Sequence, residues 1–301
     1  MNKLWQKFLF KKVQQSKNKS ILLVKDEKKL KVSCLQTVPK ETIKEALDEA
    51  LDLASIAISN NSKFLFLPEY CGGITSNGKL YFPPSEKETK HLFLKEFKKF
   101  CETNKIWVSI GSIAIKLENN KIVNRSFILN PSGEIVSKYD KIHMFDISID
   151  GEEHYESSTI HFGNKGVLAE TEIGIIGHSI CYDIRFPNLY RKLAQSGAEI
   201  LIIPAAFTKT TGSAHWHILN RSRAIENVCF VISPCAVGKI PGGGESYGHS
   251  LIINPWGKII KDGGDQRGII STTINTNEVS KYRNQLPSLS HDKNFTISKL
   301  L

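Results

Sequence analysis

The chain of 301 residues is 41% hydrophobic and 23% charged, a composition ordinary for a globular protein with a sizeable core. No stretch approaches the roughly 20 apolar residues that a membrane-spanning helix needs. The net charge of +10 lies mostly in residues 1–29, which carry nine lysines against Asp26 and Glu27. The rest of the chain has little net charge and no basic stripe interleaved with aromatic residues, so we expect no nucleic-acid binding.

Residues 1–29 are expected to form a basic, poorly ordered N-terminal extension, and residues 30–301 a single domain. Leu4, Trp5 and Phe8 also fit one apolar face of a short helix, so contact with a membrane surface or a partner protein is the alternative. The extension has neither the cleavage site of a secretory signal nor the arginines of a mitochondrial presequence.

The first elements of the domain follow from hydrophobic periodicity. Residues 31–36 alternate as a strand, and Pro39 opens an amphipathic helix that runs to about Ser59. Residues 64–67 predict a short buried strand. Each of these segments has one apolar face or is apolar throughout, so all three are expected to contribute to the core.

A second helix is predicted after Ser85, which is a plausible N-cap with Glu88 at the capping-box position. Its apolar face would consist of Leu92, Phe93, Phe97 and Phe100. Two strands follow, 106–115 and 122–129, and the second ends in the turn Asn130-Pro131-Ser132-Gly133.

The second half of the chain alternates strands and helices in the same way. The predicted elements are a strand at 173–180, a helix at 188–196, a strand at 199–203, a helix at 213–227, a strand at 228–233, a hairpin around 254–257, a strand at 269–274 and a last helix capped by Asn277. This order indicates one mixed α/β domain with layered sheets.

Three segments combine an apolar or β-prone run with a chemically useful side chain. Cys181 follows a strand and precedes a tight turn into a helix, a geometry that presents a nucleophile. Glu69 ends the run Phe-Leu-Phe-Leu-Pro-Glu, and Lys141 follows Ser-Lys-Tyr-Asp. Taken singly, each residue could also be an ordinary structural or surface residue, because free cysteines are common in cores and most lysines and glutamates are solvated. A convergence of all three would favour hydrolysis of an amide.

In that hypothesis Cys181 attacks as a thiolate, its pKa lowered by a neighbouring positive charge or the following helix N-terminus. Lys141 and the backbone N–H of Tyr182 stabilise the oxyanion. Glu69 takes the thiol proton, protonates the leaving nitrogen and later activates water against the thioester.

With these residues the chain resembles the nitrilase superfamily of carbon–nitrogen hydrolases. The matching motifs are Leu67-Pro68-Glu69, Tyr139-Asp140-Lys141-Ile142-His143 and the run from Cys181 to Pro187. The resemblance, from about residue 30 to 295, implies a four-layer α-β-β-α sandwich that dimerises through helices and needs no cofactor. It also implies that Glu156, the family's second glutamate, positions Lys141 and supports the proton shuttle.

The run Cys-Tyr-Asp-Ile-Arg-Phe-Pro is similar to the amidase branches of that superfamily. These include deaminated glutathione amidase, a metabolite-repair activity that we favour, and omega-amidase, which acts on keto-acid amides. A small carboxamide would then be the substrate, with Phe207 and Thr208 lining its pocket. A non-catalytic binding or scaffold role, with the basic extension as docking element, is the alternative of another class.

Other residues have competing interpretations. Cys71 is a rival thiol but follows no predicted buried strand, and His143 and His178 are expected to be hydrogen-bonded structural residues. Arg223 and Glu226 are first read as a structural ion pair, with a subunit interface as the alternative.

The six cysteines show no CxxC spacing and fall mostly in apolar runs, which predicts reduced thiols and a cytoplasmic location. His215 and His217, two residues apart on a predicted helix, would point to different faces, so we expect no metal site there.

Overall fold

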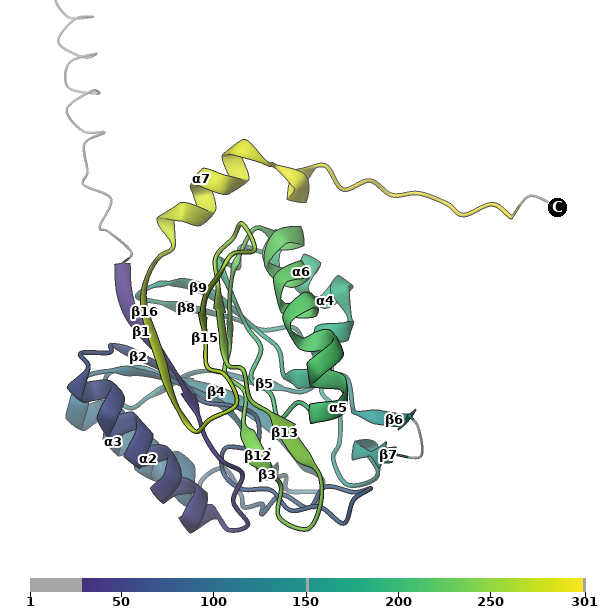
Figure 1. Cartoon of the computed structure of the whole chain (residues 1–301). Helices are drawn as coiled ribbons and strands as arrows, with labels where there is room; N and C mark the ends of the chain where they lie inside the picture. The colour runs from purple at the N-terminus through teal and green to yellow at the C-terminus, as the bar shows by residue number, and fades with distance from the viewer. Residues whose placement is uncertain (1–28, 150–151, 300–301) are drawn as a thin grey trace, which may run out of the picture.

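The computed structural model describes residues 29–149 and 152–299. The predicted extension lies outside the described residues, except for Lys29, which is the first residue of strand β1. Two six-stranded sheets form the centre of the molecule (Figure 1).

The strands of the first sheet are, in spatial order, β16 (Gly268–Asn275), β1 (Lys29–Gln36), β2 (Phe64–Phe66), β3 (Trp107–Lys116), β4 (Ile122–Leu129) and β5 (Ile135–Asp140). Those of the second sheet are β15 (Ile259–Asp262), β14 (Leu251–Ile253), β11 (Phe230–Ser233), β10 (Ile200–Ile202), β9 (Gly174–His178) and β8 (Leu168–Thr171). In each sheet three neighbouring strands are parallel, namely β1, β2 and β3 in one and β9, β10 and β11 in the other. Two small hairpins lie outside these sheets, β6 (Asp146–Ile149) with β7 (Glu152–Tyr155) and β12 (Val237–Lys239) with β13 (Glu245–Tyr247).

The two sheets pack face to face through an apolar layer to which Phe64, Phe66, Ile200 and Ile202 contribute. Leu65, between the two phenylalanines, points to the other face and packs beneath the outer helices. Strand β2 is therefore buried on both sides, which explains why its sequence is apolar throughout instead of alternating.

Helices α2 (Ile43–Ser59) and α3 (Leu92–Asn104) cover the outer face of the first sheet. Helices α4 (Pro187–Gln195) and α6 (His217–Asn227) cover the second sheet on the opposite side (Figure 1). The order helix, sheet, sheet, helix confirms the predicted four-layer α-β-β-α sandwich. Within the described ranges, no helix has the length and apolar character to cross a bilayer.

Helix α2 begins later than predicted, because Thr42 and not Pro39 provides its start. The Thr42 Oγ1 accepts from the Glu45 backbone N–H at 3.2 Å, and Glu45 Oε2 accepts from the Thr42 backbone N–H at 3.1 Å. This reciprocal capping box satisfies two amides that the helix itself leaves unpaired.

The predicted cap of the second helix was wrong. Helix α3 begins at Leu92, whose N–H donates to Glu86 Oε2 at 3.1 Å, seven residues after Ser85. Glu88 forms ion pairs with Arg125 and Lys138. The Glu88 carboxylate is therefore engaged by basic side chains of β4 and β5 and does not form the predicted capping box. The predicted apolar face is correct, since Phe93 and Phe97 are fully buried.

Two other helix starts differ from prediction. The helical segment before α6 begins earlier than residue 213, with a short turn α5 (Lys209–Thr211) and a π-helical turn η3 (Gly212–Trp216). Asn277 is the first residue of α7 (Asn277–Gln285), and Thr276 occupies the N-cap position.

Candidate active site

Glu69, Lys141 and Cys181 lie at the ends of strands from both sheets. Glu69 comes just after β2, Lys141 directly after β5, and Cys181 opens the 3₁₀ turn η2 (Cys181–Arg185) after β9. Their exposed fractions are 3%, 1% and 7%. Carboxyl ends of parallel strands are where α/β folds gather functional side chains, and here the ends of two facing sheets supply them together.

The Lys141 ammonium lies between two carboxylates. Its Nζ is 2.8 Å from Glu69 Oε1, and 3.0 and 2.8 Å from the two oxygens of Glu156. Burial disfavours a charged ammonium, but the two carboxylates outweigh it and raise the pKa of Lys141 well above its ordinary value. The lysine is therefore a fixed positive charge in a water-poor site.

Glu69 has a partner for each of its oxygens. Oε1 accepts from Lys141 and from Asn124 Nδ2 at 3.0 Å, and Oε2 accepts from the Ala206 backbone N–H at 2.9 Å. Asn124 was not singled out from the sequence. In the sequence Asn124 is one of three consecutive polar residues in strand β4, followed by Arg125 and Ser126, so nothing set it apart.

Glu156 is buried as deeply as Lys141 and is held from three sides. Besides the ammonium, Tyr70 Oη donates to Oε1 at 2.7 Å, and the Phe145 backbone N–H donates to Oε2 at 2.7 Å. Tyr70 adopts a left-handed φ of 51°, which turns the chain directly after Glu69. Tyr70 was not predicted from the sequence, since a tyrosine beside a charged residue has no distinctive pattern.

The turn at Cys181 is strained and tightly held. Cys181 has a φ of 46°, and its backbone N–H donates to the carbonyl of Pro204 at 2.9 Å. Asp183 Oδ2 accepts from the Ile180 backbone N–H at 2.8 Å and from Tyr139 Oη at 2.6 Å. Asp183 thus fixes the residue before the thiol, a role that the sequence analysis did not assign.

The expected depression of the Cys181 pKa is wrong. Burial raises the pKa of the thiol, and the charge and hydrogen bond of Glu69 raise it further, while the nearby Lys141 acts in the opposite direction without prevailing. The environment therefore favours the neutral thiol over the thiolate, chiefly through burial and the Glu69 charge. This arrangement requires a base to remove the proton, and the base lies beside it.

These side chains open into one pocket of about 390 Å³, its mouth included. Its lining residues are Glu69, Tyr70, Ile74, Tyr81, Lys141, Phe145, Glu156, Cys181, Tyr182, Ala206, Phe207, Thr208 and Thr211. All the residues proposed from the sequence for catalysis, oxyanion binding and substrate contact are among them. A wider outer hollow adjoins the pocket at Tyr81 and Thr208, and Lys209 and Lys239 are on its wall.

The rival residues have other partners. Cys71 Sγ donates to the Ser112 carbonyl at 3.3 Å, and burial raises its pKa to about 12. His143 Nδ1 is 2.6 Å from Asp183 Oδ1, and His178 lies between the hydroxyls of Ser126 and Ser137. Arg223 and Glu226 form the predicted ion pair at 2.8 Å.

Comparisons with known proteins agree with this fold. The family described as Carbon-nitrogen hydrolase matches residues 31–284. The chain is 34% identical over 267 residues to the deaminated glutathione amidase of Synechocystis sp. PCC 6803, covering 86% of this chain and 96% of that protein. It is 37% identical over 222 residues to the deaminated glutathione amidase of Yersinia enterocolitica, covering 72% and 78% of the two chains.

Among solved structures, the C. elegans NitFhit protein superimposes with a TM-score of 0.80 at 28% identity. The match covers 88% of this chain and 65% of that one, just under two thirds of its length. The fold and these relatives define the class of the protein as a hydrolase of carbon–nitrogen bonds. The chain belongs to the carbon–nitrogen hydrolase family.

Proposed function

We propose that the protein hydrolyses a small carboxamide through a thioester on Cys181. The observation that supports this most strongly is the burial of Glu69, Lys141 and Glu156 in contact with one another, in the same pocket as the thiol. Burying three charged groups costs several kcal/mol each unless they pair, and such clusters are typical of functional sites.

In the acylation step Glu69 takes the thiol proton and the Cys181 sulfur attacks the amide carbon. The oxyanion that forms is stabilised by the Lys141 ammonium and the Tyr182 backbone N–H. Glu69 then gives the proton to the leaving nitrogen, the carbon–nitrogen bond breaks, and the acyl group remains on sulfur as a thioester.

In the second step Glu69 accepts a proton from water, which attacks the thioester carbon. The acid product leaves, and the thiol is restored with the proton that Glu69 returns. Lys141 stays protonated throughout, because Glu156 and Glu69 keep its pKa high. Glu156 positions the ammonium and does not exchange protons with the substrate.

For the substrate we favour an amide of the deaminated-glutathione type. Two bacterial relatives are deaminated glutathione amidases, and the outer hollow beyond Thr208 offers room for a leaving group larger than ammonia. Lys239 would place positive charge near the terminal carboxylate of such a leaving group, whereas Lys209 is paired with Glu245 on the same wall. An omega-amidase, which releases only ammonia, would make no use of that hollow.

A substrate panel tests this proposal. Wild type and Cys181→Ala are assayed for amine release from deaminated glutathione and for ammonia release from alpha-ketoglutaramate. We expect turnover of the first substrate by wild type and none by the variant, with circular dichroism unchanged. Turnover by the alanine variant would overturn the thioester mechanism, and preference for alpha-ketoglutaramate would favour omega-amidase.

The non-catalytic scaffold alternative is tested on the thiol itself. Incubation with substrate and acid quenching should trap an acyl adduct on Cys181, visible by mass spectrometry. A scaffold protein would give no acyl adduct, and its Cys181 would also fail to react with iodoacetamide under native conditions.

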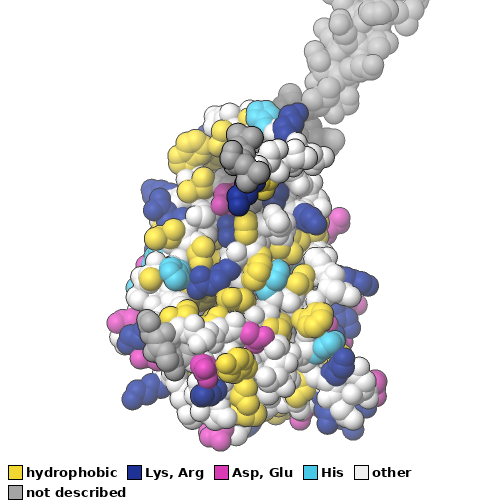
Figure 2. Space-filling model, turned by 90° about the vertical axis from the view of Figure 1, so that its right-hand side faces the viewer, with side chains coloured by type: hydrophobic (Ala, Val, Ile, Leu, Met, Phe, Trp, Pro, Cys, Tyr) yellow, Lys and Arg dark blue, Asp and Glu magenta, His cyan; other side chains and the backbone are white. Residues whose placement is uncertain are grey.

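We also propose that the protein forms a homodimer through the layer of α4 and α6. Ile218 and Ile225 on α6 are 67% and 45% exposed. Figure 2 looks onto the side of the molecule where these helices lie and shows hydrophobic side chains scattered between charged ones. Phe295 and Ile297, on the extended C-terminal segment, are 83% and 90% exposed, so a partner would cover apolar surface from both.

The proposed location is the cytoplasm. All six cysteines are unpaired and buried, and a reducing compartment preserves such thiols. Fractionation of the source cells, followed by detection of the protein in each fraction, tests this. Contact of the basic extension with a membrane surface is the competing outcome, and deletion of residues 1–28 should then abolish co-sedimentation with liposomes.

A further inference from the structure

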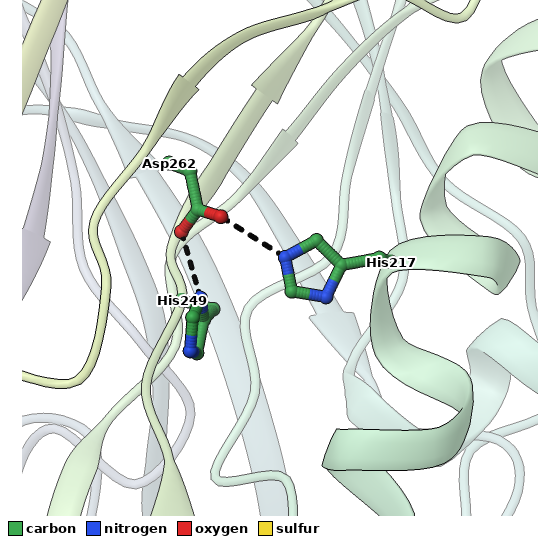
Figure 3. Close-up of side chains that lie close together, drawn as sticks. All are labelled: His217, His249 and Asp262. Carbon is green, nitrogen blue, oxygen red and sulfur yellow. Dashed lines mark hydrogen bonds and ion pairs between the residues drawn. The ribbon is translucent and has the colours of Figure 1, made fainter.

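Outside the active site, two histidines and an aspartate from three separate elements meet on the side of the second sheet. His217 is the first residue of α6, His249 precedes β14, and Asp262 is the last residue of β15 (Figure 3). His249 and Asp262 flank the hairpin of β14 and β15, but His217 lies far from them in the sequence, so the meeting is a product of the fold. Neither the sequence pattern nor the proposed amidase chemistry assigns the three residues a role.

The ligand-type atoms of this cluster face one another. His217 Nε2 is 3.0 Å from Asp262 Oδ2, and His249 Nδ1 is 2.9 Å from Asp262 Oδ1. All three residues offer an atom within 4.8 Å of the other two. Ligands bound to one zinc ion at about 2.0–2.1 Å lie about 3.3 Å apart in a tetrahedral site, so the spacing requires only small side-chain rotations.

We propose that His217, His249 and Asp262 bind a divalent transition-metal ion. Imidazole nitrogens with one carboxylate suit zinc, cobalt, nickel or copper, and not calcium or magnesium, which prefer oxygen ligands alone. The side chains are 30%, 25% and 35% exposed, so an ion reaches them from solvent and at least one position stays open for water.

The surroundings of the cluster support a defined geometry. His249 has a left-handed φ of 52°, and its ring stacks on Tyr247 with centroids 4.5 Å apart. The Gly264 backbone N–H donates to Asp262 Oδ1 at 2.9 Å and helps to hold the carboxylate in place.

The site also adjoins the wall of the pocket. Trp216, the residue before His217, donates from Nε1 to the His249 carbonyl at 2.7 Å. Its ring lies 4.9 Å from that of Phe207, which lines the pocket. A bound ion would cross-link the start of α6 to the loop before β14 and to β15, and so would stabilise this wall. His215 is not part of this site, because its ring contacts Arg185. The proposed site pairs His217 with His249 and Asp262, and not with His215.

Metal binding is tested on the full chain without an affinity tag, in the Cys181→Ala background, so that the active-site thiol does not bind the probe. Zinc chloride is titrated by calorimetry, and cobalt chloride by visible absorption. We expect one ion per chain and a cobalt spectrum typical of nitrogen and oxygen ligands, without a thiolate charge-transfer band. Zinc should also raise the melting temperature.

The ligand variants His217→Ala and His249→Ala should each weaken zinc binding at least tenfold and remove the thermal shift. His215→Ala is the matched control, two residues away on the same helical segment, and should bind like its parent. Asp262→Asn, which keeps the shape of the side chain, serves if a histidine variant does not fold. Absence of saturable binding, or binding unchanged in the His217 and His249 variants, would overturn the proposal. The cluster would then be a hydrogen-bonded His–Asp–His group only.

Discussion

At the scale of single residues, the chemistry of the site depends on how Glu156 holds Lys141. Glu156 receives the ammonium, the Tyr70 hydroxyl and the Phe145 backbone N–H, all of them donors. A glutamine in its place would keep the shape but turn one end into a donor and remove the charge. The ammonium would lose its strongest electrostatic partner and part of its fixed position.

We therefore expect Glu156→Gln to lower kcat by about 100-fold, the order seen when a preorganised oxyanion donor is lost. KM should change little, because Glu156 contacts no part of the substrate in the proposed mechanism. Steady-state kinetics with a deaminated-glutathione-type amide measure both constants. Glu153→Gln, an exposed change three residues earlier, is the control and should leave kcat unchanged. Equal loss in both variants would contradict the positioning role.

The buried His178 predicts a pH dependence of stability. Burial lowers its pKa to about 3, while an unfolded chain takes up a proton near pH 6.5. The unfolded state then binds one more proton than the folded state between these values, so stability falls as the pH drops from 6.5 toward 3. For this group the slope is about 1.4 kcal/mol per pH unit.

Urea unfolding of wild type and His178→Gln at several pH values checks this slope. The variant is expected to be less stable at neutral pH but to lose less stability on acidification. His291→Gln, at an exposed position, should reproduce the wild-type slope. Parallel slopes for wild type and His178→Gln would show that the folded state protonates His178 readily.

Residues differ in how far their roles could be predicted. Glu69, Lys141 and Cys181 each follow an apolar or β-prone run, and this pattern together with the family resemblance predicted one site. Asn124 and Tyr70 were not predicted, because each acts through contacts between segments far apart in the sequence. Asp183 was not predicted either, since its carboxylate joins the nearby Ile180 N–H to the distant Tyr139 hydroxyl. The Cys181 pKa was predicted in the wrong direction, since burial and the Glu69 charge depend on the folded environment.

At the scale of elements, apolar periodicity predicted the existence of the main helices and strands but not where the helices begin. The starts of α2 and α3 depend on which of several nearby polar side chains accepts a hydrogen bond from the unpaired backbone N–H groups of the first turn. Thr42 and Ser85 both precede helical sequence, yet Thr42 alone caps the helix that follows. Ion pairs with β4 and β5 hold Glu88 away from the role that sequence suggested.

These two positions give a paired prediction. Thr42→Ala should lower the free energy of unfolding by about 1 kcal/mol, the usual cost of losing an N-cap. Ser85→Ala should change it by less than about 0.5 kcal/mol, as surface substitutions outside such features do. Chemical denaturation of both variants measures the difference. A larger effect at Ser85 than at Thr42 would place the structural importance in the loop before α3.

At the scale of the whole molecule, the layered arrangement explains why the site is so well protected from water. Strand ends from two facing sheets converge on it, and the apolar layer between the sheets lies directly behind. The family resemblance implied that the two sheets pack on each other. The hydrophobic pattern alone could not predict this, because it does not show which buried face of a strand packs on the other sheet and which packs on the helices. The outer helical layers differ in a way that the sequence does not reveal: α6 leaves Ile218 67% exposed, whereas α2 leaves Ile56 44% exposed.

The greater exposure of Ile218 on α6 bears on the proposed dimer. If α6 packs against a second copy, Ile218→Lys would bury an unpaired charge in the interface and separate the protomers, at no cost to the monomer fold since the side chain is largely exposed. Sedimentation velocity should then show a dimer for wild type and a monomer for Ile218→Lys. Ile56→Lys on α2, the opposite layer, should remain dimeric. A monomeric wild type would refute the dimer, and dissociation by the α2 change alone would move the interface to the other face of the sandwich.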